Sequence, residues 1–317
     1  MAHEQVVKVG IVGARGYVGT ELIGLIKQHP HLQLSYAASR SQVGQVVPGM
    51  EDTQMELIDA SPQVVASQDA DVVILAVPDG ATEPYVEVLG DAIVLDLSSD
   101  HRFDDDWVYG LSEHNAESIA NARRISNPGC YATAVQLALG PIIGLVEGTP
   151  HSFGVSGYSG AGTTPSARND PKILGDGITP YALIGHTHER EISRHLGHAV
   201  RFSPHVAPFF RGITVTVQSR VREPMELGAL IEMYACAYEG SDLIEVLGER
   251  VPRVQEIAGR CGAQIGGLTI GNDGHDIAGV CTIDNLLKGA ASQAIQNLNL
   301  VFGFDAELGL VDVEVMA

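Results

Sequence analysis

The sequence predicts two domains, an α/β domain with a parallel sheet followed by an α+β domain. The chain has 317 residues and is 45% apolar, which is enough to bury two separate cores. Apolar runs in the first third do not alternate with polar residues, as is typical of parallel strands covered on both faces. Clear alternation appears only in the second half of the chain.

The first domain, residues 1–129, begins with a strand, a glycine-rich turn and a helix. We expect the strand at 6–12, the turn at 13–19 and the helix at 20–28. Further apolar runs, spaced widely enough for crossover helices, cover residues 32–38, 71–77 and 93–97. This succession predicts a doubly wound parallel sheet.

The second domain, residues 130–284, has an α+β pattern. Its expected elements are a helix from Cys130, a strand at 213–221, a helix at 226–238 and a strand at 277–283 antiparallel to the first. A last helix at 285–300 is amphipathic and rich in small residues, so we expect it to pack back onto the first domain. The segment 285–317 would then complete that domain.

Composition and charge exclude several classes of protein. Asp and Glu outnumber Lys and Arg 39 to 19, so the surface field repels nucleic-acid backbones and anionic headgroups. No apolar run approaches the ~18–20 residues of a membrane span, and residues 1–5 lead into a strand pattern rather than a signal-peptide core. The four cysteines lack the close pairing of a zinc site or a disulfide framework. We therefore expect a cytoplasmic protein with neither a nucleic-acid nor a membrane partner.

The glycine-rich turn follows the first predicted strand and opens the first predicted helix. In Rossmann domains, backbone N–H groups and the helix dipole bind a pyrophosphate at this place. The motif departs from strict G-x-G-x-x-G, because Arg15 occupies the third place, where strict dehydrogenases carry glycine. The alternative is a purely structural turn. The residues expected to contact the dinucleotide are Gly13, Arg15, Gly16, Tyr17, Val18 and Gly19.

The end of the second predicted strand favours NADP(H) over NAD. An acidic residue about 20 positions after the glycine motif would bind the ribose 2′-hydroxyl of NAD, but no carboxylate occurs between Glu21 and Glu51. The strand ends instead in Ser39, Arg40 and Ser41, whose guanidinium and hydroxyls suit a 2′-phosphate. The alternative is that Arg40 is an ordinary solvated charge.

Cys130 follows a Pro-Gly break and begins an apolar helix. At a helix start, backbone N–H groups and the positive end of the dipole favour a thiolate, and they stabilise the oxyanion that forms when it attacks a carbonyl. The alternative is a plain buried cysteine, which we expect for Cys236, Cys261 and Cys281. Cys130 is therefore the predicted nucleophile.

A thiol nucleophile needs a base, and the segment 185–192 (GHTHEREI) supplies two imidazoles and two carboxylates. A metal site is the rival interpretation. It fails the H-E-x-x-H pattern, because Ile192 stands at the second ligand position, so we expect no metal. The segment 157–161 (GYSGA) also resembles a serine-hydrolase elbow, but alanine replaces its final glycine.

Several segments together resemble the N-acetyl-gamma-glutamyl-phosphate reductase family, the NADPH-dependent enzymes of arginine biosynthesis. They are GARGYVG at 13–19, LSSDHRF at 97–103, YGLSE at 109–113, NPGCYATA at 127–134, SGYSGAG at 156–162, GHTHEREI at 185–192 and IDNLLKGAASQAIQNLNL at 283–300. The resemblance implies a catalytic domain of glyceraldehyde-3-phosphate-dehydrogenase type and a homo-oligomer, either dimer or tetramer.

The resemblance also implies roles for individual residues. Cys130 matches the family nucleophile and His188 the general acid/base, while His186 and Glu191 line or support the substrate pocket. The chain departs from the family's usual H-R-H-x-P-E-I at Thr187 and Arg190, which leaves the choice between the two imidazoles open. Two further pocket residues fall within the matched motifs, namely Asn127 and Ser159.

Three other side chains are candidates for ligand contacts. Arg102 follows the strand that ends near Asp96, where open α/β sheets bind ligands, and it would bind the departing phosphate. Its alternative is an ion pair with one of the three aspartates at 104–106. Arg211 is a candidate for the substrate carboxylate, with a structural role as the alternative. Asn285 is a candidate for the nicotinamide amide.

The expected reaction is reduction of N-acetylglutamyl 5-phosphate to the semialdehyde through a thioester on Cys130. Three alternatives stay open. One is a reductase of lysine synthesis that takes a longer acyl phosphate on an acidic carrier protein, although the net charge of −20 disfavours such a partner. Another is an enzyme of the aspartate-semialdehyde-dehydrogenase type. The third is an NADP-binding redox sensor that uses Cys130 as its switch.

Overall fold

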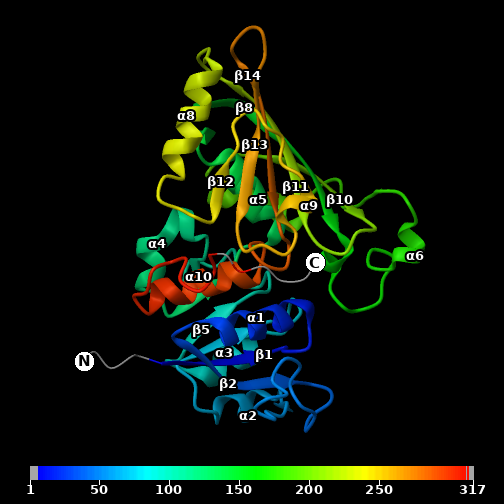
Figure 1. The fold of residues 1–317 in the computed structure, drawn as a ribbon, viewed down its shortest axis with the longest axis vertical. Helices are drawn as coiled ribbons and strands as arrows, with labels where there is room; N and C mark the ends of the chain where they lie inside the picture. Colours follow the sequence, from blue (N-terminus) through cyan, green and yellow to red (C-terminus); the bar gives the residue numbers. More distant parts are fainter. Residues whose placement is uncertain (1–5, 312, 314–317) are drawn as a thin grey trace. The chain divides into compact units, whose positions relative to one another are not determined.

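The computed structural model describes residues 6–311 and 313, which form two compact units (Figure 1). Within the described residues, one unit contains 6–128 and 290–310, and the other contains 129–289, 311 and 313. The segment 285–289, expected with the first domain, clusters with the second unit instead. Residues 1–5, which were expected to lead into the first strand, lie outside the described residues. So do residues 312 and 314–317 of the C-terminal segment that was assigned to the first domain.

The first unit is built on a seven-stranded sheet in the order β3-β2-β1-β4-β5-β7-β6, in which every neighbouring pair is parallel. Its strands are β1 (Val7–Val12), β2 (Leu32–Ser39), β3 (Ile58–Asp59), β4 (Val72–Leu75), β5 (Ile93–Asp96), β6 (Val108–Tyr109) and β7 (Arg124–Ser126). The chain order reverses between β1 and β4. Ligands of doubly wound sheets bind at such a switch point, beyond the carboxyl ends of the strands. The predicted parallel Rossmann sheet is confirmed.

In the part of the chain that the structure describes, five helices belong to the first unit. They are α1 (Tyr17–Gln28), α2 (Pro62–Ala66), α3 (Glu83–Leu89), α4 (Ser112–Ala120) and α10 (Ala291–Val301). Helix α10, red in Figure 1, packs against α1 and α4. The helix expected from residue 285 begins only at Ala291, because Ala290 has a non-helical backbone (φ −158°, ψ −79°). Before it, the Asp284 carboxylate accepts hydrogen bonds from the N–H groups of Leu286 and Leu287 and holds a separate turn.

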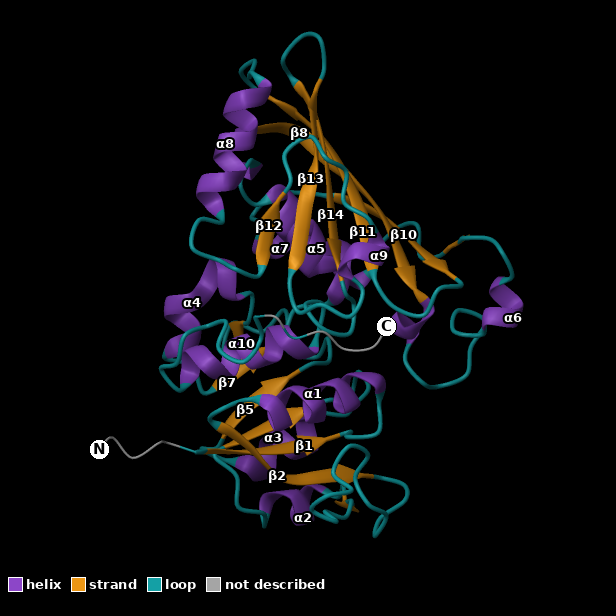
Figure 2. Ribbon diagram, viewed as in Figure 1, coloured by secondary structure: helices purple, strands orange, loops and turns teal. Residues whose placement is uncertain are grey.

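The second unit contains a mixed seven-stranded sheet in the order β12-β13-β14-β11-β8-β10-β9 (Figure 2). Its strands are β8 (Val146–Gly157), β9 (Thr179–Pro180), β10 (Arg201–Ala207), β11 (Ile213–Val221), β12 (Ile244–Val246), β13 (Ala263–Ile270) and β14 (Asp276–Ile283). The predicted antiparallel pairing of β11 with β14 is confirmed. The pairs β8–β10 and β12–β13 are parallel.

The helices of the second unit leave one face of this sheet open. They are α5 (Cys130–Leu139), α6 (Pro171–Leu174), α7 (Thr187–His195), α8 (Leu227–Ala237) and α9 (Val254–Ile257), with 3-10 turns at Ile143–Leu145 and Tyr158–Ala161. Helix α5 packs on β11, β13 and β14, and α8 packs on β13. All of α5 after its first residue is buried, so the core of this unit fixes the position of Cys130.

Candidate active site

The glycine turn after β1 has the close packing that a nucleotide site requires. Gly13 has a φ of +92°, and a Cβ there would lie 2.1 Å from the carbonyl oxygen of Ala76. A Cβ on Gly19 would lie 2.5 Å from the carbonyl oxygen of Gly13, so only glycine lets α1 approach the turn. Gly16 is the N-cap of α1, which has neither a side-chain cap nor an acidic residue in its first turn. This helix end therefore fits a pyrophosphate.

Arginine and serine side chains gather at the carboxyl ends of β1 and β2. The Arg15 guanidinium donates a hydrogen bond of 2.9 Å to the Ser41 hydroxyl, which links the glycine turn to the loop after β2. The Ser39 hydroxyl accepts a hydrogen bond of 3.3 Å from the Ser41 N–H. Arg40 is exposed beside them. These loops combine positive charge with hydroxyl donors, as a phosphate monoester requires.

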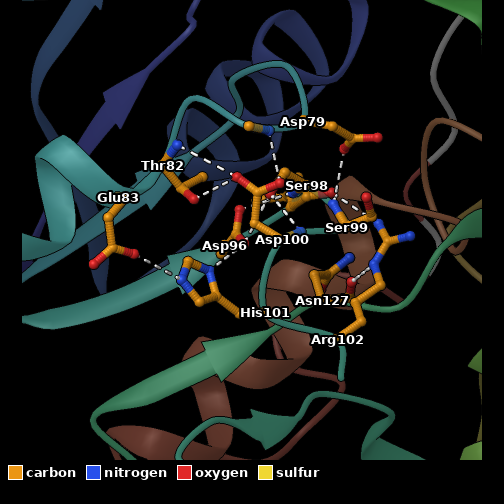
Figure 3. Close-up of polar contacts among 12 residues, drawn as sticks. Asp79, Thr82, Glu83, Asp96, Ser98, Ser99, Asp100, His101, Arg102 and Asn127 are labelled. Carbon is orange, nitrogen blue, oxygen red and sulfur yellow. Dashed lines mark hydrogen bonds and ion pairs between the residues drawn. The ribbon is translucent and has the colours of Figure 1, made fainter. Parts of the chain in front are cut away.

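The loops after β4 and β5 are tied together by carboxylates (Figure 3). Asp100 accepts hydrogen bonds from the Thr82 hydroxyl at 2.6 Å and from the Gly80 N–H at 2.7 Å. Burial disfavours its charged form, but these bonds outweigh that effect and lower the pKa of Asp100. Asp79 accepts from the Ser99 N–H at 2.9 Å. The loop after β5 is thus held firmly in place.

His101 is buried at the centre of this cluster. Its Nδ1 lies 2.8 Å from Oδ2 of the fully buried Asp96, and its ring stacks on Trp107 at 3.9 Å between centroids. Burial alone would lower the pKa of His101. The hydrogen bond with Asp96 and the charges of Asp96, Asp100 and Glu83 outweigh burial, so the pKa is raised.

This raised pKa predicts a pH-dependent contribution of His101 to stability. A group whose pKa is higher in the folded than in the unfolded chain stabilises fully below the unfolded value, near 6.5, and loses that effect as pH rises through the folded value. His101→Gln should therefore lower the free energy of unfolding most at pH 5.5, by about 1–3 kcal/mol. The deficit should shrink towards pH 9. Urea unfolding of both proteins across this range checks the slope, and a constant deficit would contradict it.

Arg102 and Asn127 are both buried and hold backbone segments of the first unit together. The Arg102 guanidinium donates to the Asn127 carbonyl at 2.9 Å (Figure 3). It also donates to the Leu97 carbonyl at 2.9 Å. The Asn127 side chain donates to the Ala290 carbonyl and accepts from Asn297. These contacts favour a structural contribution from both residues.

Cys130 is the first residue of α5 and is half-buried. The N-cap is Gly129, whose N–H donates a hydrogen bond of 2.8 Å to the carboxylate of Glu191, a fully buried residue of α7. Gly289 lies against Cys130, since a Cβ there would be 2.6 Å from the Cys130 Cβ. Glu191 thus supports the backbone that presents the thiol.

Two imidazoles lie at the start of α7 in the same unit. Nδ1 of His186 accepts a hydrogen bond of 3.1 Å from the His188 N–H, so His186 caps the helix and its ring proton is on Nε2. Burial and then the charge of Arg168 lower the pKa of His186, which favours the neutral ring. The His188 ring lies 4.8 Å from the His186 ring and 6.0 Å from the ring of Tyr131, the residue after Cys130.

Three predicted contact residues brace the second unit instead of facing outwards. The Arg211 guanidinium forms a buried ion pair with Asp284, at 2.5 Å from Nε and 3.2 Å from its second nitrogen. The Asn285 side chain donates to the Ser159 hydroxyl at 2.9 Å and accepts from the Gly212 N–H at 2.6 Å. Each of Arg211, Asn285 and Ser159 is at most 5% exposed. These contacts favour the structural alternative for Arg211 and extend it to the other two residues.

The other cysteines differ from Cys130. Cys281 is completely buried, and burial raises its pKa far above the usual range. Cys261 is also buried, whereas Cys236, expected inside, is exposed because it lies on the outer side of α8. Within residues 6–311 and 313 no group of three or more His, Cys, Asp or Glu residues is arranged to hold a metal ion. None of the helices described there is both long and apolar enough to cross a membrane.

Sequence reasoning missed Tyr131, Tyr181 and Arg168 in this unit. The Arg168 guanidinium lies over the Tyr181 ring, 5.0 Å from its centroid, and Tyr181 lies 5.6 Å from His186. Burial and then the charge of Cys130 raise the pKa of Tyr181 to about 12. The available signal was an arginine between the SGYSGAG and GHTHEREI motifs, in a chain with few cations.

Two family models match the chain. The semialdehyde dehydrogenase NAD-binding domain matches residues 8–122, and the semialdehyde dehydrogenase dimerisation domain matches residues 130–285. The fold and the thiol at the start of α5 agree with both matches. The class of protein is therefore that of the semialdehyde dehydrogenases.

Relatives narrow this class. An N-acetyl-gamma-glutamyl-phosphate reductase of Xanthomonas oryzae is 50% identical, over 95% of this chain and 97% of the relative. One from Xylella fastidiosa is 47% identical, over 94% and 93%. The chain belongs to the N-acetyl-gamma-glutamyl-phosphate reductase family, as its motifs predicted.

Solved structures of lower identity share the fold. Aspartate semialdehyde dehydrogenase II of Vibrio cholerae, complexed with ASA, has a TM-score of 0.78 at 20% identity, covering 94% of this chain and 99% of that one. The Candida albicans enzyme with NADP has a TM-score of 0.74 at 16% identity and the same coverage.

Proposed function

We propose that the chain reduces N-acetylglutamyl 5-phosphate to N-acetylglutamate 5-semialdehyde and inorganic phosphate, with NADPH as the reductant, in arginine biosynthesis. We assign cofactor binding to the first unit and the thiol chemistry to the second. The observation that carries the proposal is Cys130 at the first position of α5, in the unit that also presents His186 and His188. The family relationship supplies the substrate, and the glycine turn after β1 supplies a fitting nucleotide site.

The Cys130 thiolate attacks the acyl carbon, the bond from that carbon to the phosphate oxygen breaks, and a thioester remains. His188 accepts the thiol proton and passes it to the departing phosphate. NADPH, when bound, supplies the hydride that reduces the thioester carbon. Backbone N–H groups at the start of α5 stabilise the oxyanion that forms on the acyl oxygen. When the carbon–sulfur bond breaks, the aldehyde leaves and the thiolate is restored.

Geometry favours His188 over His186 as the acid/base. Nδ1 of His186 is already an acceptor for the cap of α7, so protonation there would cost the helix its cap. The His188 ring instead lies beside Tyr131, next to the nucleophile. We therefore keep His188 as the proton carrier and His186 as the residue that orients it.

NADP(H) is the cofactor that the loops at the ends of β1 and β2 support. A 2′-phosphate there would meet Arg15, Arg40 and the hydroxyls of Ser39 and Ser41. NAD would leave this positive charge unused, and no carboxylate occurs between Glu21 and Glu51 to bind its 2′-hydroxyl.

The test of the proposed function is the reverse reaction. NADP reduction with N-acetylglutamate 5-semialdehyde should require inorganic phosphate, and NAD should replace NADP poorly. The homologous aldehyde with one more methylene should have a kcat/KM about 10- to 200-fold lower. Turnover without phosphate would contradict the acyl-phosphate reaction, and a preference for the longer aldehyde would favour the lysine-pathway alternative.

We propose that the chain self-associates through the open face of the second sheet. On β8, Phe153 is 41% exposed and faces Thr216 of β11 and Ser203 of β10. The next strand places Val280 of β14 beside Thr216, so apolar and hydroxyl side chains alternate across the face. The match to a dimerisation domain over these strands supports a second copy as the partner.

The cysteines are far apart in the sequence and are free thiols, which fits a cytoplasmic location.

A further inference from the structure

The proposed substrate carries a carboxylate that needs a cationic partner, and Arg211 does not provide one. The Arg211 side chain is only 4% exposed, and its guanidinium is already bound to the Asp284 carboxylate. Taking it from Asp284 would leave a buried carboxylate without its counter-charge, which costs several kcal/mol. A carboxylate-binding cation for the thiol unit must therefore come from elsewhere.

Arg168 lies in a loop whose shape is fixed by Asn169. The Asn169 amide donates to the carbonyls of Gly162 and Thr164 at 2.8 and 2.7 Å, and its oxygen accepts from the Ser166 N–H at 2.7 Å. The Ser166 hydroxyl accepts from the Arg168 N–H at 3.3 Å. These bonds fold the loop back onto the end of the SGYSGAG motif. They therefore fix the backbone conformation at Arg168.

A row of rings leads from the nucleophile to Arg168. Tyr131 follows Cys130, its ring contacts that of His188, and the His188 ring contacts that of His186. Tyr181 comes next, 5.6 Å from His186, and the Arg168 guanidinium covers its other side at 5.0 Å. The cation thus lies in the same cluster as the acid/base residues, on the ring of Tyr181, whose pKa is raised by burial and then by the charge of Cys130.

Arg168 has no carboxylate partner among the residues that the structure describes. The arginines Arg201, Arg220 and Arg250 each lie within 4 Å of a carboxylate, in a chain of net charge −20. The charge of Arg168 nevertheless acts on the cluster, because it is one of the causes that lower the pKa of His186. A guanidinium that faces the site without a counter-ion suits an incoming anion.

We propose that Arg168 binds the α-carboxylate of the substrate and thereby selects for it. The inference rests on the proposed function, since the carboxylate belongs to that substrate. With the acyl carbon at Cys130, this carboxylate lies four carbon–carbon bonds away, at the far end of the substrate chain. Tyr181 holds the guanidinium by its ring face, which leaves the edge of the fork available for two parallel hydrogen bonds.

The test compares two aldehydes in the reverse reaction. N-acetylglutamate 5-semialdehyde carries the carboxylate, and 4-acetamidobutanal is the same chain without it. Arg168→Met should raise KM for the first aldehyde and lower its kcat/KM about 10- to 100-fold. The kcat/KM for 4-acetamidobutanal should stay within about twofold, and Arg168→Lys should restore part of the difference.

The control is Arg250→Met, which removes the same charge from an exposed ion-paired site in the loop after β12 and should leave the kinetics with both aldehydes unaffected. An equal loss for both aldehydes with Arg168→Met would overturn the inference while leaving the proposed function intact. A rise in the KM for inorganic phosphate alone would also overturn it, by assigning Arg168 to phosphate. Absence of turnover with wild-type protein would instead reject the proposed function itself.

Discussion

Cys130→Ser is expected to reduce kcat by on the order of 10⁴-fold or more, because it removes the proposed nucleophile of the thioester step. Serine keeps the shape of the side chain, but its hydroxyl is not ionised near neutral pH, so the helix end has no thiolate to stabilise. Phosphate-dependent NADP reduction with N-acetylglutamate 5-semialdehyde measures the loss. Binding of NADPH, followed by its fluorescence, should be unchanged.

The chain offers a matched control in Cys236→Ser. Cys236 is an exposed thiol on α8, and its replacement should leave kcat and KM unchanged. Iodoacetamide should inactivate wild type and the Cys236 variant at the same rate. Retained turnover in Cys130→Ser would exclude covalent catalysis. It would also exclude the assignment of the thiol chemistry to the second unit.

The sequence predicted the parallel sheet well because its signals are local. β1, β2, β4 and β5 are buried on both faces, so each reads as a short apolar run bounded by turns. The stretch around Gly154, in contrast, shows only a high glycine content in the sequence, although it forms the second half of β8. A Cβ on Gly154 would lie 2.5 Å from the Tyr131 ring. This glycine is required by a side chain far away in the sequence, which no local pattern reveals.

The candidate site divides in the same way. The start of α5 was predictable because Pro128 and Gly129 break the chain immediately before Cys130. A structural role for Arg211 was only one of two possible interpretations of the sequence. Its partner Asp284 follows a different strand, β14, and only the folded sheet brings the two side chains together. Arg168 was missed because its contact with Tyr181 depends on a loop whose conformation is fixed by hydrogen bonds of the Asn169 side chain. Contacts between distant segments need the tertiary structure.

Gly289→Ala is expected to damage the site through packing. A Cβ at this position would lie 2.6 Å from the Cys130 Cβ, 2.7 Å from the Asn285 carbonyl oxygen and 2.9 Å from the Asn285 Cα. Two of these atoms are backbone atoms, and the third belongs to Cys130 at the start of a buried helix, so none can move without an energetic cost. Overpacking should lower the free energy of unfolding by about 1–3 kcal/mol. Displacement of the thiol by about 1 Å should lower kcat about 10²-fold.

Gly228→Ala separates this effect from the general effect of replacing glycine. Gly228 lies in α8 of the same unit, and a Cβ there would meet no atom within 4 Å. Alanine should raise the stability of that helix by roughly 0.5–1 kcal/mol and leave kcat unchanged. Iodoacetamide labelling of Cys130 should slow in Gly289→Ala but not in Gly228→Ala. Wild-type kcat and labelling in Gly289→Ala would mean that the thiol tolerates displacement, so that its contact with Gly289 does not set the geometry of attack.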